Sequence, residues 1–429
     1  MIRRGLTVLA LAALLAPSAS YAAEATSGTL PHGGSYVMLS DAAVPTVAID
    51  LWFRAPSAGY DNAQQGLARV AATAAAAATL ESGKSLVALV RDLGGRIAIS
   101  TFPDMTGVTV SAPAGAATKI VAALSAAYFT PAIDADALKA AQRDSAVLSA
   151  EHSYSSDDII HDALFGTIFS SGPAHVPPLA ASVNDIASFA LTDVKAFAQR
   201  AFRSANATIA LTGNVDASIL DAITAGTPGA QDAPYDSTLA SSPKTPATIS
   251  GLVAGDGTAW AGPPISDPRA ATAMDFIADY LFRDETGVVS SALSATGDTY
   301  LIGQFITLHD PGIMLVTTSG SDSAATQKRV LDAVTALQQP LRPDTFTAAR
   351  NAFLYHIASD TQTPVEQADN VGWYAAQGNA SYAPSSVGGA YWNLAAGLDP
   401  DFVASVARRY LAHPVVVHLQ ATSTKESSS

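Results

Sequence analysis

Residues 46–58 read TVAIDLWFRAPSA, and residues 66–83 read GLARVAATAAAAATLESG. The first stretch is rich in β-branched and aromatic residues, which favours a strand. Alanine dominates the second stretch and loses almost no side-chain entropy on entering a helix. Arg69 is the one charged residue between Leu67 and Leu80. A strand followed by a packing helix therefore opens an α+β domain.

Further elements surround this unit. Residues 35–41 form another apolar strand, and the short AAVP turn before residue 46 predicts a hairpin with the strand at 46–53. Alternating apolar residues predict a second hairpin at 96–113. Helices are expected at 85–95, 118–129 and 135–166.

The chain repeats itself. Residues 191–215 and 398–422 each contain an amphipathic helix that closes on an aromatic residue and leads into an apolar strand. Aligning Phe202 with Tyr410 gives an offset of 410 − 202 = 208 residues. This distance is too long for a solenoid and predicts two homologous domains.

The stretch between the repeats is rich in Pro, Ser, Thr and Ala, which is typical of an extended linker. We therefore expect a first domain at 23–226, a linker at 227–249 and a second domain at 250–425. In the second domain, strands are expected near 258–261, 299–307 and 312–318, and helices at 268–282, 322–337, 343–358 and 364–377. Each domain should contain an antiparallel-rich sheet covered by helices.

Composition excludes several classes of protein. Hydrophobic residues make up 48% of the chain and charged residues 14%, which supports sizeable cores. The net charge of −14 disfavours nucleic acid as a partner. The absence of cysteine excludes disulfides, a thiolate nucleophile and a cysteine-ligated metal.

Residues 1–22 have the pattern of a secretory signal peptide. Arg3 and Arg4 precede an apolar segment, and Ser20 and Ala22 supply the small residues before a cleavage site. No later stretch is apolar enough to insert in a membrane. We therefore expect an exported protein that is periplasmic or secreted.

The order of these segments resembles the M16 metallopeptidases, the family of pitrilysin, insulinase and the processing peptidases. The resemblance covers most of the chain after residue 22 and is sharpest at TVAIDLWFRAPSA and GLA. It implies that two homologous α+β domains form half of a clam-shell chamber.

In that family the helix beginning GLA carries the inverted zinc motif His-x-x-Glu-His. Matching the helix starts places Arg69 and Thr73 at the two histidine positions and Ala72 at the catalytic glutamate. None of them can replace the family residue, because Arg is permanently cationic, Ala has no acceptor and Thr is a weak ligand. The third ligand, a glutamate, would fall near Ala150, with Glu151 one residue away. The resemblance therefore implies a member without zinc or any other cofactor.

An Arg and Tyr pair from the second domain holds substrate backbone in the family. The matching residues here are Thr296 and Tyr300, so only the tyrosine is kept.

The family also binds peptide along the strand after the Gly-Gly pair, by adding a strand to the sheet. That strand corresponds to Ile97, Ala98, Ile99 and Ser100, and Ala98 replaces the family asparagine.

Other polar residues offer weaker alternatives. Glu151, His152 and His161, with two nearby aspartates, could hold a metal, although a solvated helix start explains them equally well. His175 fits a structural turn better than a ligand. The tryptophans are expected to anchor cores or interfaces rather than to stack ligands: Trp52, Trp260, Trp373 and Trp392.

Three hypotheses for function remain. The first is a non-catalytic subunit that pairs with a zinc-bearing M16 homologue to form a chamber for peptides or unfolded segments. The second is a pseudoenzyme, alone or as a homodimer, that binds peptides or scaffolds a periplasmic complex. The third is an enzyme that uses the cluster around His152.

Overall fold

The computed structural model describes residues 25–30, 33–57, 59–60, 64–176, 181–223, 226, 228–294, 299–383 and 388–422. The predicted signal peptide at 1–22 and Thr296 lie outside these residues. No described helix combines the length and the apolar character needed to cross a membrane.

The first half of the chain forms a six-stranded sheet in the order β1-β2-β7-β3-β5-β4. Its strands are β1 (Thr26–Thr29), β2 (Ser35–Ser40), β3 (Thr46–Phe53), β4 (Arg96–Thr101), β5 (Thr106–Pro113) and β7 (Ala207–Gly213). The predicted hairpin at 96–113 is confirmed, because β4 pairs antiparallel with β5.

The predicted hairpin of residues 35–41 and 46–53 is wrong. Strand β7 lies between the two, parallel to β2 and antiparallel to β3. Every residue of β7 is buried. A strand that is apolar on both faces gains most from burial at the centre of a sheet. This long-range pairing therefore replaces the local hairpin.

The second half repeats this arrangement with five strands in the order β11-β12-β10-β13-β9. They are β9 (Ala247–Gly251), β10 (Gly255–Ala261), β11 (Thr299–Ile306), β12 (Ile313–Gly320) and β13 (Val415–Ala421). Strands β9 and β13 are parallel, as are β2 and β7. Strand β13 begins 415 − 207 = 208 residues after β7, which agrees with the predicted repeat. A small sheet pairs β6 (Phe169–Ser171) of the first half with β8 (Thr238–Leu239), which lies within the predicted linker.

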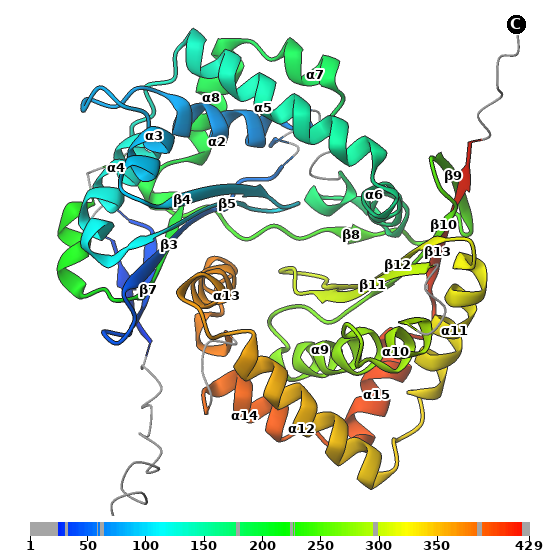
Figure 1. Ribbon diagram of the computed structural model, residues 1–429. Helices are drawn as coiled ribbons and strands as arrows, with labels where there is room; N and C mark the ends of the chain where they lie inside the picture. The colour runs from blue at the N-terminus through cyan, green and yellow to red at the C-terminus, as the bar shows by residue number, and fades with distance from the viewer. Residues whose placement is uncertain are drawn as a thin grey trace, which may run out of the picture.

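Helices cover the outer face of each sheet (Figure 1). On the first sheet these are α2 (Leu67–Ala77), α3 (Leu86–Asp92), α4 (Ala117–Phe129), α5 (Ala135–Tyr154), α7 (Val183–Ser188) and α8 (Leu191–Ala201). On the second they are α9 (Pro268–Phe282), α10 (Val288–Ser294), α11 (Ser323–Ala336), α12 (Pro343–Ser359), α14 (Ala390–Ala396) and α15 (Pro400–Tyr410).

The two halves exchange one helix each. Helix α6 (Ser156–Ile168), from the first half, packs on β10, β12 and β13 of the second sheet. Helix α13 (Pro364–Ala376), from the second half, packs on β3 and β7 of the first sheet. The starts of α6 and α13 are 364 − 156 = 208 residues apart, so they are equivalent members of the repeat.

The boundary of α6 corrects the predicted helix at 135–166. That segment forms two helices, because the Ser155 side chain accepts a hydrogen bond from the backbone N–H of Asp158 and so begins a new helix. The break turns the chain away from α5 and toward the second sheet.

Glycine permits the close contact of the exchanged helices with the sheets. A Cβ atom at Gly372 of α13 would lie 2.3 Å from Trp52 Nε1 on β3. A Cβ atom at Gly257 of β10 would lie 2.2 Å from Ile160 Cγ2 on α6. A side chain at either position would push the helix off its sheet.

One acidic side chain is buried in the first sheet. Asp50 on β3 is fully buried, and apart from the side chain of Thr109 opposite it on β5, which offsets part of the pKa shift, its carboxylate oxygens have no hydrogen-bond partner among the described residues. Burial, and next the carboxylate of Asp369 on α13, raise the pKa of Asp50 well above its ordinary value. Ionised Asp50 therefore destabilises the fold.

We expect Asp50→Asn to stabilise the protein at neutral pH. The carboxyl of the unfolded chain ionises near pH 4, whereas the folded protein holds its proton to higher pH, so the wild type loses stability as pH rises through this range. The variant lacks this loss and should be more stable at pH 7–8 by about 1–3 kcal/mol. Urea unfolding at a series of pH values measures the difference.

The exposed substitution Glu81→Gln is the matched control and should leave the curve unchanged. A stability difference that is the same at pH 4 and pH 8 would contradict the assignment of the effect to Asp50 ionisation.

Candidate functional site

The alanine-rich helix α2 is packed on several sides. It contacts α5, α8 and α4, and Ala72 is fully buried. The Ala72 carbonyl accepts a hydrogen bond of 3.0 Å from the Tyr128 hydroxyl on α4. Burial raises the pKa of Tyr128, so its hydroxyl remains a donor. The alanine run thus serves helix packing.

The residues at the expected zinc positions make other contacts. Arg69 donates from Nη1 to the backbone carbonyl of Ile99 on β4. Burial lowers the pKa of Arg69, while Tyr128 and Asp144 oppose that shift. The Thr73 hydroxyl is buried and has no hydrogen-bond partner among the described residues.

These residues do not fit a zinc ion. A guanidinium and a threonine hydroxyl stand where two imidazoles are required. On α5, Ala150 is half-buried and Glu151 is exposed. Across the described part of the chain, no group of three or more His, Asp or Glu could hold a metal ion.

The predicted peptide-binding strand, β4, lies at the edge of the first sheet. Ile97 and Ile99 pack against the core of the first half, whereas Ala98 and Ser100 are exposed. Tyr300 lies on β11, the corresponding edge of the second sheet, and 61% of its surface is exposed.

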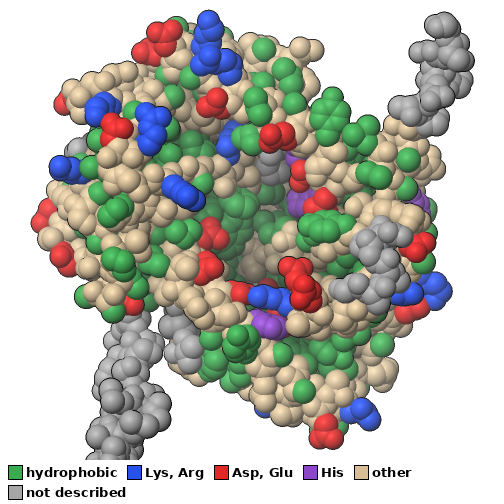
Figure 2. Space-filling model, viewed as in Figure 1, with side chains coloured by type: hydrophobic (Ala, Val, Ile, Leu, Met, Phe, Trp, Pro, Cys, Tyr) green, Lys and Arg blue, Asp and Glu red, His purple; other side chains and the backbone are tan. Residues whose placement is uncertain are grey.

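A cavity of about 820 Å³ lies between the two halves. It is lined by the end of β4, by β11, by the exchanged helices α6 and α13, and by α9 and α12. Figure 2 looks into this hollow, where apolar side chains form the deep wall and charged and histidine side chains gather around the rim. The cavity therefore adjoins both open sheet edges.

The cavity lining is acidic. The lining includes one arginine, Arg283, and three histidines, His152, His161 and His356. The carboxylates that line it are Asp157, Asp158, Asp162, Asp275, Asp279, Asp360 and Asp369. This excess of carboxylates favours a cationic ligand.

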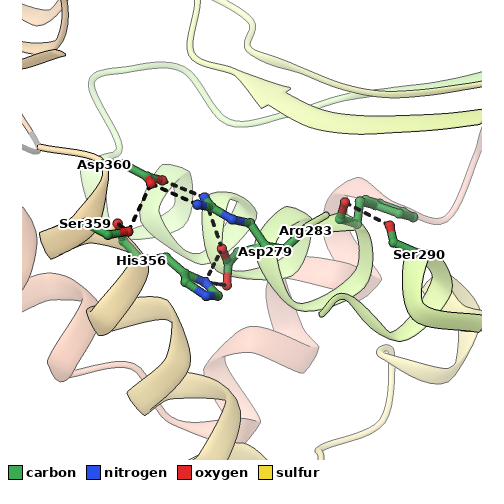
Figure 3. A network of polar contacts seen from close by, with 7 residues as sticks. Asp279, Arg283, Ser290, His356, Ser359 and Asp360 are labelled. Atoms are coloured by element: carbon green, nitrogen blue, oxygen red, sulfur yellow. Dashed lines mark hydrogen bonds and ion pairs between the residues drawn. The ribbon is translucent and has the colours of Figure 1, made fainter. Parts of the chain in front are cut away.

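A network of polar contacts joins α9 to α12 at one side of the cavity (Figure 3). His356 Nδ1 lies 2.8 Å and 3.0 Å from the two carboxylate oxygens of Asp279. Arg283 donates two hydrogen bonds to Asp360, at 2.5 Å and 2.8 Å, and the Ser359 hydroxyl also reaches Asp360 at 3.1 Å. The hydrogen bond from Arg283 lowers the pKa of Asp360.

Burial has the opposite effect on neighbouring acids. It raises the pKa of Asp279, although His356 offsets part of the shift. It raises the pKa of Asp275 to about 7, against a hydrogen bond of 2.7 Å from the Tyr391 hydroxyl. Because Nδ1 of His356 is engaged, only its Nε2 is left for an interaction in the cavity.

The cluster around His152 forms the joint between α5 and α6. His152 Nε2 lies 2.5 Å from Asp162 Oδ2, and its Nδ1 lies 3.5 Å from Asp158 Oδ2. His161 stacks on Phe165 instead, with ring centroids 4.5 Å apart. Glu151, His152 and His161, which the sequence offered as one alternative, do not form a group that could hold a metal ion among the described residues, although His161 Nδ1 also lies 3.9 Å from Asp162 Oδ1.

Burial lowers the pKa of His152, but the hydrogen bonds to Asp158 and Asp162 outweigh it and raise the pKa to about 9. His152 is therefore cationic at neutral pH. It neutralises part of the acidic lining and stabilises the break between α5 and α6.

The remaining candidates have structural roles. His175 Nδ1 lies 2.7 Å from the Phe169 carbonyl in a turn. Trp52, Trp373 and Phe102 form an aromatic cluster beside the cavity, with centroids 4.9–5.6 Å apart. Trp260 is fully buried in the second core, and Trp392 packs against it.

Sequence reasoning missed the network of Figure 3. One signal was present: Asp275, Asp279 and Arg283 recur every four residues and so share one face of a largely buried helix. Their partner His356 lies 356 − 279 = 77 residues after Asp279, so the local pattern does not show the pairing.

We expect His152→Gln to reduce the pH dependence of stability above neutrality. Because the folded pKa of His152 is raised to about 9, its contribution is complete below the unfolded pKa near 6.5 and is lost as pH rises through 9. Between pH 6.5 and 9.5 the free energy of unfolding of the wild type should fall by about 1–2 kcal/mol more than that of the variant. Solvent screening of His152 and its aspartates keeps this value below what the full pKa shift would give. Urea unfolding tests this, with the exposed His413→Gln as control; parallel curves for wild type and His152→Gln would refute it.

No protein-family model and no curated protein matches this chain. Chains of similar fold are found among solved structures. A protease from Helicobacter pylori superposes with a TM-score of 0.79 at 16% identity, covering 93% of this chain and 100% of that one.

Two further structures extend the match. A peptidase M16 inactive domain from Pseudomonas fluorescens has a TM-score of 0.76 at 17% identity, covering 93% of this chain and 98% of its own. A protein described as an M16-like peptidase from Alicyclobacillus acidocaldarius has a TM-score of 0.73 at 14% identity, with coverage of 93% and 98%. The predicted fold class is confirmed: this chain has the α+β fold of the M16 peptidases, with two homologous domains.

Proposed function

We propose that this chain is a non-catalytic M16-like subunit that binds extended peptides and pairs with a zinc-bearing homologue. The proposal rests on the contrast between the zinc positions on α2, which are engaged in other contacts, and the cavity between the two halves. Arg69, at the first zinc position, is bonded to Ile99. The cavity between the two sheet edges, by comparison, is large and lined with charged and aromatic side chains.

The two sheet edges suit a peptide in extended conformation. Strands β4 and β11 each pair on one side only among the described strands, so backbone groups along these edges can accept another strand, although the Ile99 carbonyl of β4 already accepts from Arg69. The end of β4 and residues 303–306 of β11 also line the cavity. A bound segment can therefore pair with an edge and place a side chain in the cavity.

The lining favours a side chain with a positive charge and an apolar stem. Carboxylates attract the ammonium of lysine or the guanidinium of arginine, and the ring of Trp373 or Phe102 can contact the methylene groups. Acidic peptides are repelled by the same carboxylates. We therefore propose basic or neutral peptide segments as ligands.

Two features support a partner. A two-domain chain supplies half of a clam-shell chamber, and the cavity is open toward the viewer in Figure 2. One of the similar structures is itself described as an inactive M16 domain. We propose a zinc-bearing M16 homologue as the covering partner and the periplasm as the location, after removal of residues 1–22.

The alternative function is a stand-alone or homodimeric pseudoenzyme that binds peptides or scaffolds a complex. Its support is that the cavity exists in a single chain. Both functions share peptide binding and differ in the need for a zinc-bearing partner. An enzyme built on the His152 cluster is disfavoured, because His152 is bonded to two aspartates. Stoichiometric zinc or manganese in the isolated protein would reverse that judgement.

We expect a labelled peptide with several Lys and Arg residues to bind more tightly than its Glu-substituted counterpart. The affinity should fall as salt is raised from 50 to 500 mM, because salt screens the carboxylates. Asp369→Asn removes a cavity carboxylate and should weaken binding of the basic peptide about 3- to 10-fold. Fluorescence anisotropy measures all three effects.

This variant separates binding from folding. Asp369 contributes to the raised pKa of Asp50, so its neutralisation should not lower stability. Glu81→Gln removes a carboxylate outside this cavity and should bind as the wild type does. Equal affinity for basic and acidic peptides would contradict the proposed ligand class.

The subunit proposal has its own test. If an M16 chain with an intact His-x-x-Glu-His motif is encoded beside this protein, the two should co-purify. The pair should cleave peptides that the zinc-bearing chain alone leaves intact, because only the pair forms a closed chamber. No gain in cleavage, despite a stable complex, would favour the scaffold alternative.

A further inference from the structure

The outer edge of the second sheet differs from that of the first. Strand β9 corresponds in the repeat to β2, since each pairs parallel with the equivalent central strand. The other side of β2 is covered by β1, which runs antiparallel to it. Among the described residues, no strand covers the other side of β9. Among the described strands, the position in the repeat that corresponds to β1 is therefore not filled beside β9.

This edge of β9 carries no charge. From Pro246 to Gly255 the chain contains no Asp, Glu, Lys or Arg. Open edges in soluble proteins usually carry charges that prevent pairing with other chains. Next to the edge, Leu252 and Val253 expose 59% and 50% of their surface. In a chain of net charge −14, a neutral and partly apolar edge is suited to contact another protein surface.

We propose that β9 pairs with β9 of a second copy of this chain, antiparallel, about a two-fold axis at Ile249. Thr248 then lies opposite Ser250 of the partner copy, and both are exposed on the same face. Ile249, which is half-buried, lies opposite its own copy on the face covered by α6. The pairing joins two five-stranded sheets into one of ten.

Self-pairing fits this edge because its sequence is self-complementary in that register. Hydroxyl residues meet hydroxyl residues, isoleucine meets isoleucine, and no like charges are brought together. The antiparallel direction also reproduces the arrangement of β1 on β2. Leu252 and Val253 continue past the paired residues and bury apolar surface against the partner copy.

This dimer is independent of the proposed function. Residues 247–251 do not line the cavity, and β9 lies at the outer edge of the second sheet (Figure 1). The cavity mouth stays open for a peptide or for a different partner. A failure of peptide binding therefore leaves the dimer untouched, and the reverse also holds.

Light scattering after size-exclusion chromatography tests the dimer on the protein without residues 1–22. The wild type should show twice the mass of one chain at high concentration and dissociate on dilution. The double variant Thr248→Lys and Ser250→Lys places lysines opposite lysines and should remain at the mass of one chain. Both residues are exposed, so the fold should be retained.

A matched control carries two lysines on the other open edge, as Ala98→Lys and Ser100→Lys, which are also exposed, and it should dimerise. Nitroxide labels on the variant Thr248→Cys, in a chain without native cysteine, should give a short inter-label distance in the dimer. A monomeric wild type at every concentration, or a dimer that survives the double lysine variant, overturns the proposal. The proposal is also overturned if the label at position 248 becomes mobile only after residues 423–429 are removed. That result would mean that the end of the same chain covers the edge.

Discussion

The fold depends on one constraint: central strands such as β3, β7 and β10 are buried on both faces, and each half of the chain covers only one face of its own sheet. Helices of the same half cover the outer face of each sheet, and the inner face needs a cover from elsewhere. Helices α6 and α13 supply it by crossing to the opposite sheet. Each half is therefore incomplete without the other, and separating them would expose both inner faces to water.

The exchange also determines where a ligand can bind. The two crossing helices, α6 and α13, bring their polar sides together between the sheets, and the sheet edges β4 and β11 end at the same place. The cavity is a consequence of this crossing rather than of any one motif. Polar groups from four helices meet there, and the network of Asp279, Arg283, His356 and Asp360 fixes α9 against α12.

The sequence predicted the parts of the fold that depend on local pattern. The helix at 268–282 is confirmed as α9, and the hairpin at 96–113 as β4 and β5. The offset of 208 residues was visible because aromatic and apolar residues recur at that distance. The order of strands was not predictable in this way, because β7 enters between β2 and β3 from about 150 residues further along the chain.

The cavity was harder to predict than the zinc positions. A resemblance assigns Arg69, Ala72 and Thr73 from one helix, because the family motif is local. The cavity instead combines residues such as Asp158, Asp279 and Asp369 from three helices that are distant in sequence. The burial of Asp50 was equally unpredictable from the sequence. An aspartate in a strand normally indicates an exposed position, and only the packing of α13 on β3 buries this one.

The energetic contrast between the two regions supports the proposed function. In α2, alanine packs without charge and Arg69 donates to the Ile99 carbonyl, although Arg69 Nε and the Thr73 hydroxyl are buried without a hydrogen-bond partner among the described residues, so this helix holds no group that could bind zinc. Around the cavity, burial disfavours the ionised forms of Asp275 and Asp279, so these side chains reduce stability where a neutral residue would not. Packing alone gives no reason to keep such carboxylates. A ligand that carries positive charge does, because its binding would favour the ionised forms of these carboxylates.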